Sequence, residues 1–276
     1  MISRPDRPRG RGRRSGSPPV ADGARELGVP LYQPPSVNSE EALAEIDRAA
    51  PESAIVCAFG ALIKEPLLSR HPMLNVHPSL LPRWRGAAPI ERALIAGDRE
   101  TGVCVMRLTA GLDSGPVCLR ASAPIGEHDD YGTLAARLCT LGAELLVQAL
   151  DAAGAGAPLP FVDQDETGAT YAEKILAEDR LLDPARSAAE LARIVRALHP
   201  HIGANLKLTD GSVLGVQQAQ ALTREDSPDD LQPGALAKDD GRLLLGTSDG
   251  ALHLLDVKPP GGRAMDAQAY LRGHAL

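Results

Sequence analysis

Residues 74–89 read LNVHPSLLPRWRGAAP and carry the clearest chemical signal in the sequence. Asn75 and His77 lie two positions apart at the predicted end of a strand, so their side chains share one face. Pro78 and Pro82 then end the strand and stiffen the loop that follows it. A carboxamide that can hold an oxyanion, next to an imidazole that titrates near neutral pH, is what acyl transfer to an amine requires.

A second motif, AGLDSGPV, occupies residues 110–117, and Asp113 is its only acidic residue. Its glycines permit a tight loop. A carboxylate next to His77 favours the imidazolium and orients a proton-carrying water. Taken singly, Asn75, His77 and Asp113 are better explained as strand-end and turn residues; together and in this order they indicate a catalytic trio.

The composition is that of a folded protein. The 276 residues are 43% hydrophobic and 24% charged, which suits about two domains. No run of 18 apolar residues is present, and the Arg-rich N-terminus has no apolar core, so we expect neither a membrane-spanning helix nor a secretory signal. Four cysteines match no zinc or disulfide spacing and no histidine belongs to a ligand cluster, so we expect reduced thiols and no metal.

Hydrophobic spacing predicts an α/β part followed by a mostly β part. Short strands are predicted at residues 54–58, 103–108 and 117–119, and helices at residues 88–96 and 131–150. Residues 151–160 are rich in Gly, Ala and Pro and indicate a linker. Beyond it, Ser187 and Glu190 form a capping box that begins a helix, and Asp-Gly pairs separate several short strands.

Charge is unevenly distributed along the chain. The net charge is −7, yet residues 1–14 contain six arginines and one acidic residue. A basic arm on an acidic body indicates a specific anionic partner rather than general polyanion binding. Residues 1–19 are rich in Arg, Gly, Pro and Ser, and we expect them to form a mobile loop or arm; a solvated tail without function is the alternative.

These motifs resemble those of the folate-dependent formyltransferases. The resemblance rests on NVHPSLLPRWRGAAPI at 75–90, AGDRETGV at 96–103 and AGLDSGPV at 110–117. TYAEKI at 170–175 and RIVRALHP at 193–200 extend it over nearly all of the chain. Within this family, the basic arm and residues 83–89 most resemble the branch that acts on methionyl-tRNA.

The resemblance implies a fold, substrates and partners. We expect an α/β, Rossmann-like formyltransferase domain with a parallel sheet over residues 1–150, a linker over 151–174 and an OB-like β-barrel that binds tRNA over 175–276. The implied formyl donor is 10-formyltetrahydrofolate, used as a co-substrate without a metal, and the implied acceptor is methionyl-initiator tRNA. We also expect the protein to be a cytoplasmic monomer with no membrane partner.

The resemblance also assigns roles to individual residues. Asn75, His77 and Asp113 match the catalytic trio: Asn75 and the His77 imidazolium stabilise the oxyanion, and Asp113 relays the proton of the amine. The residues matching folate-contacting positions are Ser79, Leu80, Leu81 and Pro82, together with Phe59, Gly60 and Ile63. The residues expected to bind tRNA are Arg7, Arg9, Arg11, Arg13 and Arg14, among which Arg11 matches the most important position.

The chain departs from this family at its start. Family members open with a strand, a Gly-Thr-Pro loop and a helix, so we expect that roughly thirty residues of a first β-α-β unit are missing. In the family that strand is central in the sheet, and its loss leaves the backbone groups of its neighbours unpaired. A misassigned start codon explains this, and predicts an in-frame apolar strand and Gly-Thr-Pro upstream.

Three alternatives stay open on the sequence alone. A formyltransferase for UDP-amino sugars and a 10-formyltetrahydrofolate hydrolase belong to the same superfamily, but neither explains the basic arm. An inactive remnant that binds tRNA or folate is the third alternative, because of the missing segment. Formyl transfer to charged initiator tRNA distinguishes all three from the expected activity.

Overall fold

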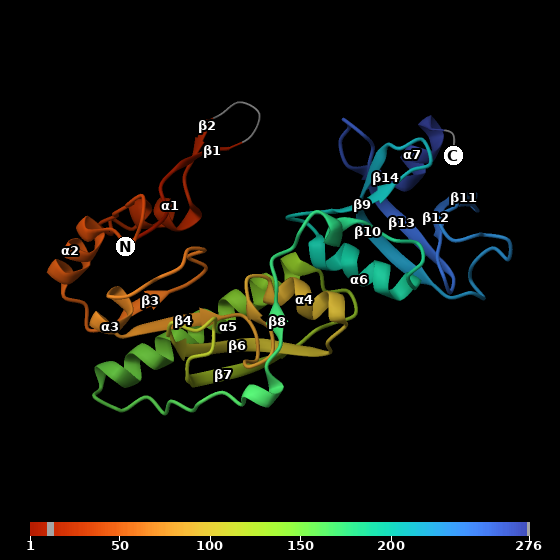
Figure 1. Cartoon of the computed structure of the whole chain (residues 1–276). Coiled ribbons are helices and arrows are strands. Elements are labelled where there is room, and N and C mark those ends of the chain that lie inside the picture. Colours follow the sequence, from red (N-terminus) through yellow and green to blue (C-terminus); the bar gives the residue numbers. More distant parts are fainter. Residues whose placement is uncertain (10–13, 275–276) are drawn as a thin grey trace.

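A computed structural model describes residues 1–9 and 14–274 of the chain (Figure 1). Its N-terminal half contains a central sheet in the order β3-β4-β6-β7. These strands are Ala54–Val56, Met73–His77, Glu100–Arg107 and Val117–Pro124. In this sheet β3 pairs in parallel with β4, and β6 pairs antiparallel with both β4 and β7, so β6 runs against the direction of the other three strands. The prediction of a parallel sheet is therefore wrong for the pairings of β6, because the loop of residues 108–116 turns the chain directly back from β6 into β7.

Two predicted helices cover and border this sheet. Helix α4, Pro89–Ala96, ends at Gly97, whose φ of +76° gives the left-handed C-cap expected of glycine. Helix α5, Tyr131–Gly154, packs on β6 and β7 and buries Leu134, Leu138 and Leu145. It extends four residues beyond the predicted end into the expected linker. Helix α5 is also long and apolar enough to cross a membrane, with 28% of its most apolar window buried in the fold.

The first fifty residues form a separate layer beside the edge strand β3. Ile2 pairs in parallel with Tyr32, and this layer contains the helices α1 (Pro19–Glu26) and α2 (Glu40–Ala49). A third short helix, α3 (Leu67–Arg70), follows β3 in the chain. Residues 1–19 are not irregular throughout as expected, because β1 (Arg7–Arg9) and β2 (Arg14–Gly16) form an antiparallel ribbon. Figure 1 shows this ribbon extending away from the central sheet.

The segment between the two halves of the chain folds back on the N-terminal half. It contains two 3₁₀ turns, Glu166–Gly168 and Glu178–Arg180, and the short strand β8, Tyr171–Ala172. Strand β8 pairs in parallel with β5, Arg85–Gly86, in the loop that follows the Asn-x-His motif. The connection therefore belongs to the surroundings of that motif in space.

The C-terminal half is the predicted small β domain. Helix α6, Ala188–Leu198, begins at the predicted capping box, where Ser187 and Glu190 each bond the other's backbone N–H. The strands are β9 (Ala204–Lys207), β10 (Val213–Leu222), β11 (Leu236–Asp239), β12 (Arg242–Gly246), β13 (Ala251–Lys258) and β14 (Met265–Asp266), followed by α7 (Ala267–Gly273). They form an antiparallel sheet in the order β11-β12-β13-β10-β9, with β14 on β13.

Contacts between helices α4 and α6 join the two halves. Arg92 of α4 pairs with Asp179 through two hydrogen bonds of 3.0 Å. In the other direction, Nε of Arg193 in α6 donates to the carbonyl of Ile95 at 3.1 Å. The pair with Asp179 ties α4 to the connecting segment, whereas the bond from Arg193 joins α6 directly to α4. Charge-assisted hydrogen bonds are more directional than apolar contacts, so the Arg193 bond helps to set the orientation of α6 on α4.

Candidate active site

Strand β4 positions Asn75 and His77 as predicted. The strand lies between β3 and β6, where Asn75 pairs with Val56 and Met106, and His77 pairs with Cys104. Both side chains are buried on the same face, His77 at 4% exposure and Asn75 at 9%. The strand period of two therefore places the amide and the imidazole next to each other.

The imidazole of His77 is held by a hydrogen bond at one ring nitrogen and faces a carboxylate with the other. Its Nε2 lies 2.9 Å from the backbone carbonyl of Trp84. A carbonyl can only accept, so Nε2 carries a hydrogen and the other nitrogen, Nδ1, is left for chemistry. Nδ1 lies 3.7 Å from Oδ2 of Asp113, whose side chain is 16% exposed. The structure thus brings together two of the predicted catalytic residues from motifs far apart in the sequence.

Asp113 is fixed in an unusual backbone conformation. Its φ is +44°, in the left-handed region that residues with a Cβ seldom adopt. Its Oδ2 accepts a hydrogen bond of 2.9 Å from the backbone N–H of Gly86. The Asn75 amide, in contrast, makes no side-chain hydrogen bond to any residue that the structure describes, so its N–H groups are available to a ligand.

The loop after β4 uses several predicted folate-contacting residues for its own closure. Ser79 is fully buried, and its hydroxyl donates to the carbonyl of Arg83 at 2.6 Å. Leu81 is 3% exposed and packs with Cys104 and Met106. The side chains of Ser79 and Leu81 are therefore engaged in closing the loop and packing it against the sheet.

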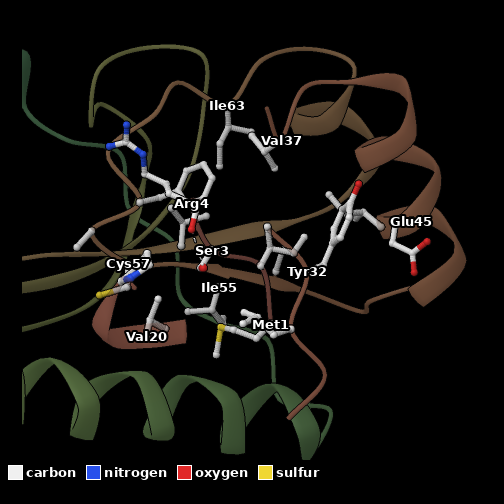
Figure 2. Close-up of a pocket in the computed structure, with 18 of the residues that line it drawn as sticks. Met1, Ser3, Arg4, Val20, Tyr32, Val37, Glu45, Ile55, Cys57 and Ile63 are labelled. Carbon is white, nitrogen blue, oxygen red and sulfur yellow. Dashed lines mark hydrogen bonds between the residues drawn. The ribbon is translucent and has the colours of Figure 1, made fainter. Parts of the chain in front are cut away.

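A large cavity lies on the other side of β3. It has a volume of about 960 Å³ and separates the Ile2–Tyr32 pair from the open edge of β3 (Figure 2). Figure 2 shows the side chains of Met1, Val20 and Ile55 around it. Of the predicted folate-contacting residues, Phe59 and Ile63 line this cavity, whereas none of the catalytic trio does. Among the described residues, β3 is the last strand of the sheet on this side.

Comparisons with known proteins now bear on this site. A model of the formyl transferase family matches residues 1–150, and a model of the formyl transferase C-terminal domain matches residues 174–275. This chain is a member of the formyltransferase family. Two methionyl-tRNA formyltransferases, from Methylococcus capsulatus and Halorhodospira halophila, are each 42% identical over the whole chain, which covers 89% and 88% of their lengths.

Solved structures share the fold of this formyltransferase. HypX from Aquifex aeolicus in complex with tetrahydrofolic acid superposes with a TM-score of 0.66 at 19% identity, over 91% of this chain and 43% of that one. A sugar N-formyltransferase from Shewanella superposes with a TM-score of 0.59, also at 19% identity, over 72% of this chain and 80% of that one. At these identities the likeness concerns the fold alone.

One residue of this formyltransferase that sequence reasoning missed is Asp98, in the turn after α4. Its carboxylate accepts two hydrogen bonds from Arg83, at 2.9 and 2.6 Å, and one from Nε1 of Trp84 at 2.7 Å. The Arg83 guanidinium also lies 4.3 Å from the centre of the Trp84 ring. Asp98 therefore holds Trp84, with φ at +64°, where its carbonyl reaches His77. Asp98 falls within a motif of the resemblance, AGDRETGV, but its spacing alone indicates no role.

Arg85 is a second residue that sequence reasoning missed. Its side chain is 2% exposed and pairs with Glu166 through hydrogen bonds of 2.9 and 2.7 Å. These bonds lower the pKa of the Glu166 carboxyl. A buried guanidinium needs such a partner, because leaving it unpaired carries a large desolvation cost. Since Glu166 follows Arg85 by 81 residues, no local pattern could predict the pair.

The basic arm is described only in part. Arg7 is exposed and lies opposite Gly16, and Arg9 lies opposite Arg14 in the ribbon. Arg11 and Arg13 fall outside the residues that the structure describes. Within the described ranges, no group of three His, Cys, Asp or Glu side chains is placed to hold a metal ion.

Proposed function

We propose that this chain transfers the formyl group of 10-formyltetrahydrofolate to the α-amine of methionyl-initiator tRNA. The observation that carries the proposal is the approach of His77 Nδ1 to Asp113, next to the available amide of Asn75. The full-length similarity to proteins named methionyl-tRNA formyltransferase supports the choice of acceptor. The reaction takes place in the cytoplasm, where charged tRNA is used, and we expect the enzyme to act as a monomer.

The three side chains divide the work of an acyl transfer. The α-amine attacks the formyl carbon, and negative charge develops on the formyl oxygen. N–H groups of Asn75 and the Nδ1–H of protonated His77 donate hydrogen bonds to that oxygen. Asp113 accepts the proton that the attacking amine must lose, and this proton is passed to the donor nitrogen as its bond to the formyl carbon breaks. The products are N-formylmethionyl-tRNA and tetrahydrofolate.

The folate co-substrate needs a path to these residues. Phe59 and Ile63 line the large cavity and supply apolar surface that suits a pterin ring. The other predicted folate-contacting residues, 79–82, follow directly after His77 at the end of strand β4. Acceptor tRNA then approaches from the side of the basic ribbon, whose arginines neutralise phosphates and stack on exposed bases.

The decisive experiment measures formyl transfer from 10-formyltetrahydrofolate to methionyl-initiator tRNA. The wild-type chain is compared with His77→Ala, which we expect to be slower by about 10²–10⁴-fold, the usual contribution of a general acid–base group. Affinity for tRNA stays the same, because His77 is buried away from the ribbon. His71→Ala is the matched control, since His71 pairs with Asp47 of helix α2 and does not belong to the predicted trio.

Further arms of the assay separate the alternatives. Formate release without tRNA identifies a hydrolase, and formylation of a UDP-amino sugar identifies a sugar enzyme. Binding of tRNA or folate with no turnover identifies an inactive remnant. Equal rates for the wild-type chain and His77→Ala contradict the assigned mechanism. A chain extended upstream by an apolar strand is tested alongside, because the open edge of β3 could accept one.

A further inference from the structure

Gln164 makes three hydrogen bonds around the Asp113 loop. Its Nε2 donates to the backbone carbonyls of Asp113 at 2.8 Å and Gly115 at 2.7 Å. Its Oε1 accepts from Nε of Arg85 at 3.0 Å. Both amide hydrogens and the amide oxygen are therefore used, and the orientation of the side chain is fully determined. Gln164 follows Asp113 by 51 residues in the sequence.

The surrounding segment, residues 164–172, contacts the same site at further points; we refer to it as the strap. Glu166 holds the Arg85 guanidinium, and β8 pairs with β5, so that Gly86 lies opposite Ala172. Gly86 in turn donates its N–H to the Asp113 carboxylate. The strap thus fixes the backbone of Asp113 through Gln164 and its carboxylate through β5.

Asp113 needs this support for a physical reason. Its positive φ is sterically unfavourable, so the loop relaxes unless outside contacts hold it. A displacement of about 1 Å at a catalytic group can lower a rate by about 10²-fold. The 3.7 Å approach to His77 Nδ1 therefore depends on what holds the Asp113 backbone.

We propose that Gln164 is a positioning residue that keeps Asp113 aligned with His77 for formyl transfer. This inference rests on the proposed function, because it assigns Gln164 a part in the reaction of that site. It makes the strap part of the active site, although the strap follows the catalytic motifs in the chain and lies between the regions matched by the two family models.

The test uses Gln164→Glu in the full-length chain. The new side chain has the same shape, but its carboxylate cannot donate to the carbonyls of Asp113 and Gly115. We expect kcat for formyl transfer to fall by about 10²-fold while KM for tRNA and for the folate donor stays unchanged. We expect Gln164→Met, whose side chain has no hydrogen-bond donor and no charge, to lower kcat in the same way and to leave both KM values unchanged. The matched control is Gln232→Glu, because Gln232 is exposed and bonds only within its own C-terminal turn.

A second readout is independent of activity. The Gly86 N–H is protected from hydrogen exchange by its bond to Asp113, and it loses protection in Gln164→Glu and Gln164→Met while the unfolding temperature stays unchanged. Wild-type kcat and wild-type Gly86 protection in both variants overturn the inference, and so does a rate loss that only follows a loss of folded protein. If His77→Ala abolishes transfer while both Gln164 variants keep full rate, the inference fails and the proposed function stands. If the wild-type chain transfers no formyl group, the proposed function fails, and intact Gly86 protection in the variants removes the positioning role as well.

Discussion

The backbone N–H of Gly86 donates a 2.9 Å hydrogen bond to Oδ2 of Asp113, the same oxygen that lies 3.7 Å from Nδ1 of His77. This bond joins two motifs that are 27 residues apart. A hydrogen bond to a carboxylate is stronger than one between neutral groups, so it restricts the rotation of the Asp113 side chain. Gly86 therefore helps to fix the position of the Asp113 carboxylate next to His77.

Replacing Gly86 with Ala should damage both stability and activity. Its φ is +123°, and a Cβ at this position would lie 2.7 Å from the carbonyl oxygen of Ala172. We expect Gly86→Ala to lower the free energy of unfolding by about 1–3 kcal/mol and to reduce kcat. Urea denaturation and the transfer assay measure the two effects. Gly23→Ala is the control, since a Cβ there meets nothing within 4 Å; equal behaviour of both variants contradicts the prediction.

Removing the charge of Asp113 should slow the reaction without unfolding the protein. Asp113→Asn keeps an oxygen that accepts from Gly86 but cannot take a proton from the amine. We expect kcat to fall by about 10²–10⁴-fold, with an unchanged melting temperature. Asp163→Asn serves as the control, because Asp163 is exposed and makes no side-chain bond to any described residue. A rate within error of wild type for Asp113→Asn removes Asp113 from the mechanism.

Neutralising arginines of the basic arm should weaken tRNA binding in a salt-dependent way. We expect the triple change Arg9→Gln, Arg11→Gln and Arg13→Gln to reduce the slope of log affinity against log salt by about 2–3, since each phosphate contact contributes about 0.7–0.9. Filter binding at several salt concentrations measures the slope. Arg48→Gln in helix α2 is the control, with a side chain that is 70% exposed and paired with Glu45. An unchanged slope in the triple variant means that these three arginines of the basic arm do not contact tRNA.

Acid should destabilise the fold partly through Asp129, at the start of α5. Hydrogen bonds from Arg137, followed by those from the Gly126 N–H and Thr133, lower the pKa of Asp129 to about 2. Because the folded-state pKa is depressed, the stabilisation is complete above about pH 4 and is lost as the pH falls toward 2. Arg137 is 41% exposed, so we expect Asp129→Asn to cost only about 1–2 kcal/mol at pH 7.

Urea unfolding at pH 7, 4 and 3 measures this effect. The wild-type chain should lose more stability between pH 4 and 3 than Asp129→Asn does, so the two unfolding curves converge on acidification. Asp163→Asn should follow the wild-type curve at every pH. A constant difference between the wild-type chain and Asp129→Asn over this range contradicts the assignment.

Local sequence patterns predicted several elements correctly. The Asn-x-His spacing placed both side chains on one face of β4, Gly97 ended α4, and the Ser187–Glu190 box began α6. Each of these depends on a few neighbouring residues, since strand alternation and helix capping are short-range properties of the backbone. The Asp-Gly pair at 240 likewise forms the turn between β11 and β12, with both residues at positive φ.

The sequence by itself therefore determined which residue types lie on which face, where α4 ends and α6 begins, and the family to which the chain belongs. Only the tertiary structure decided that β6 and β7 run antiparallel, that part of the basic arm is a ribbon, and that Asp98, Gln164 and Glu166 support the loops around His77. The reason is physical: these partners are separated by 14 to 81 residues, and packing and turn closure, rather than local propensity, determine which distant groups meet.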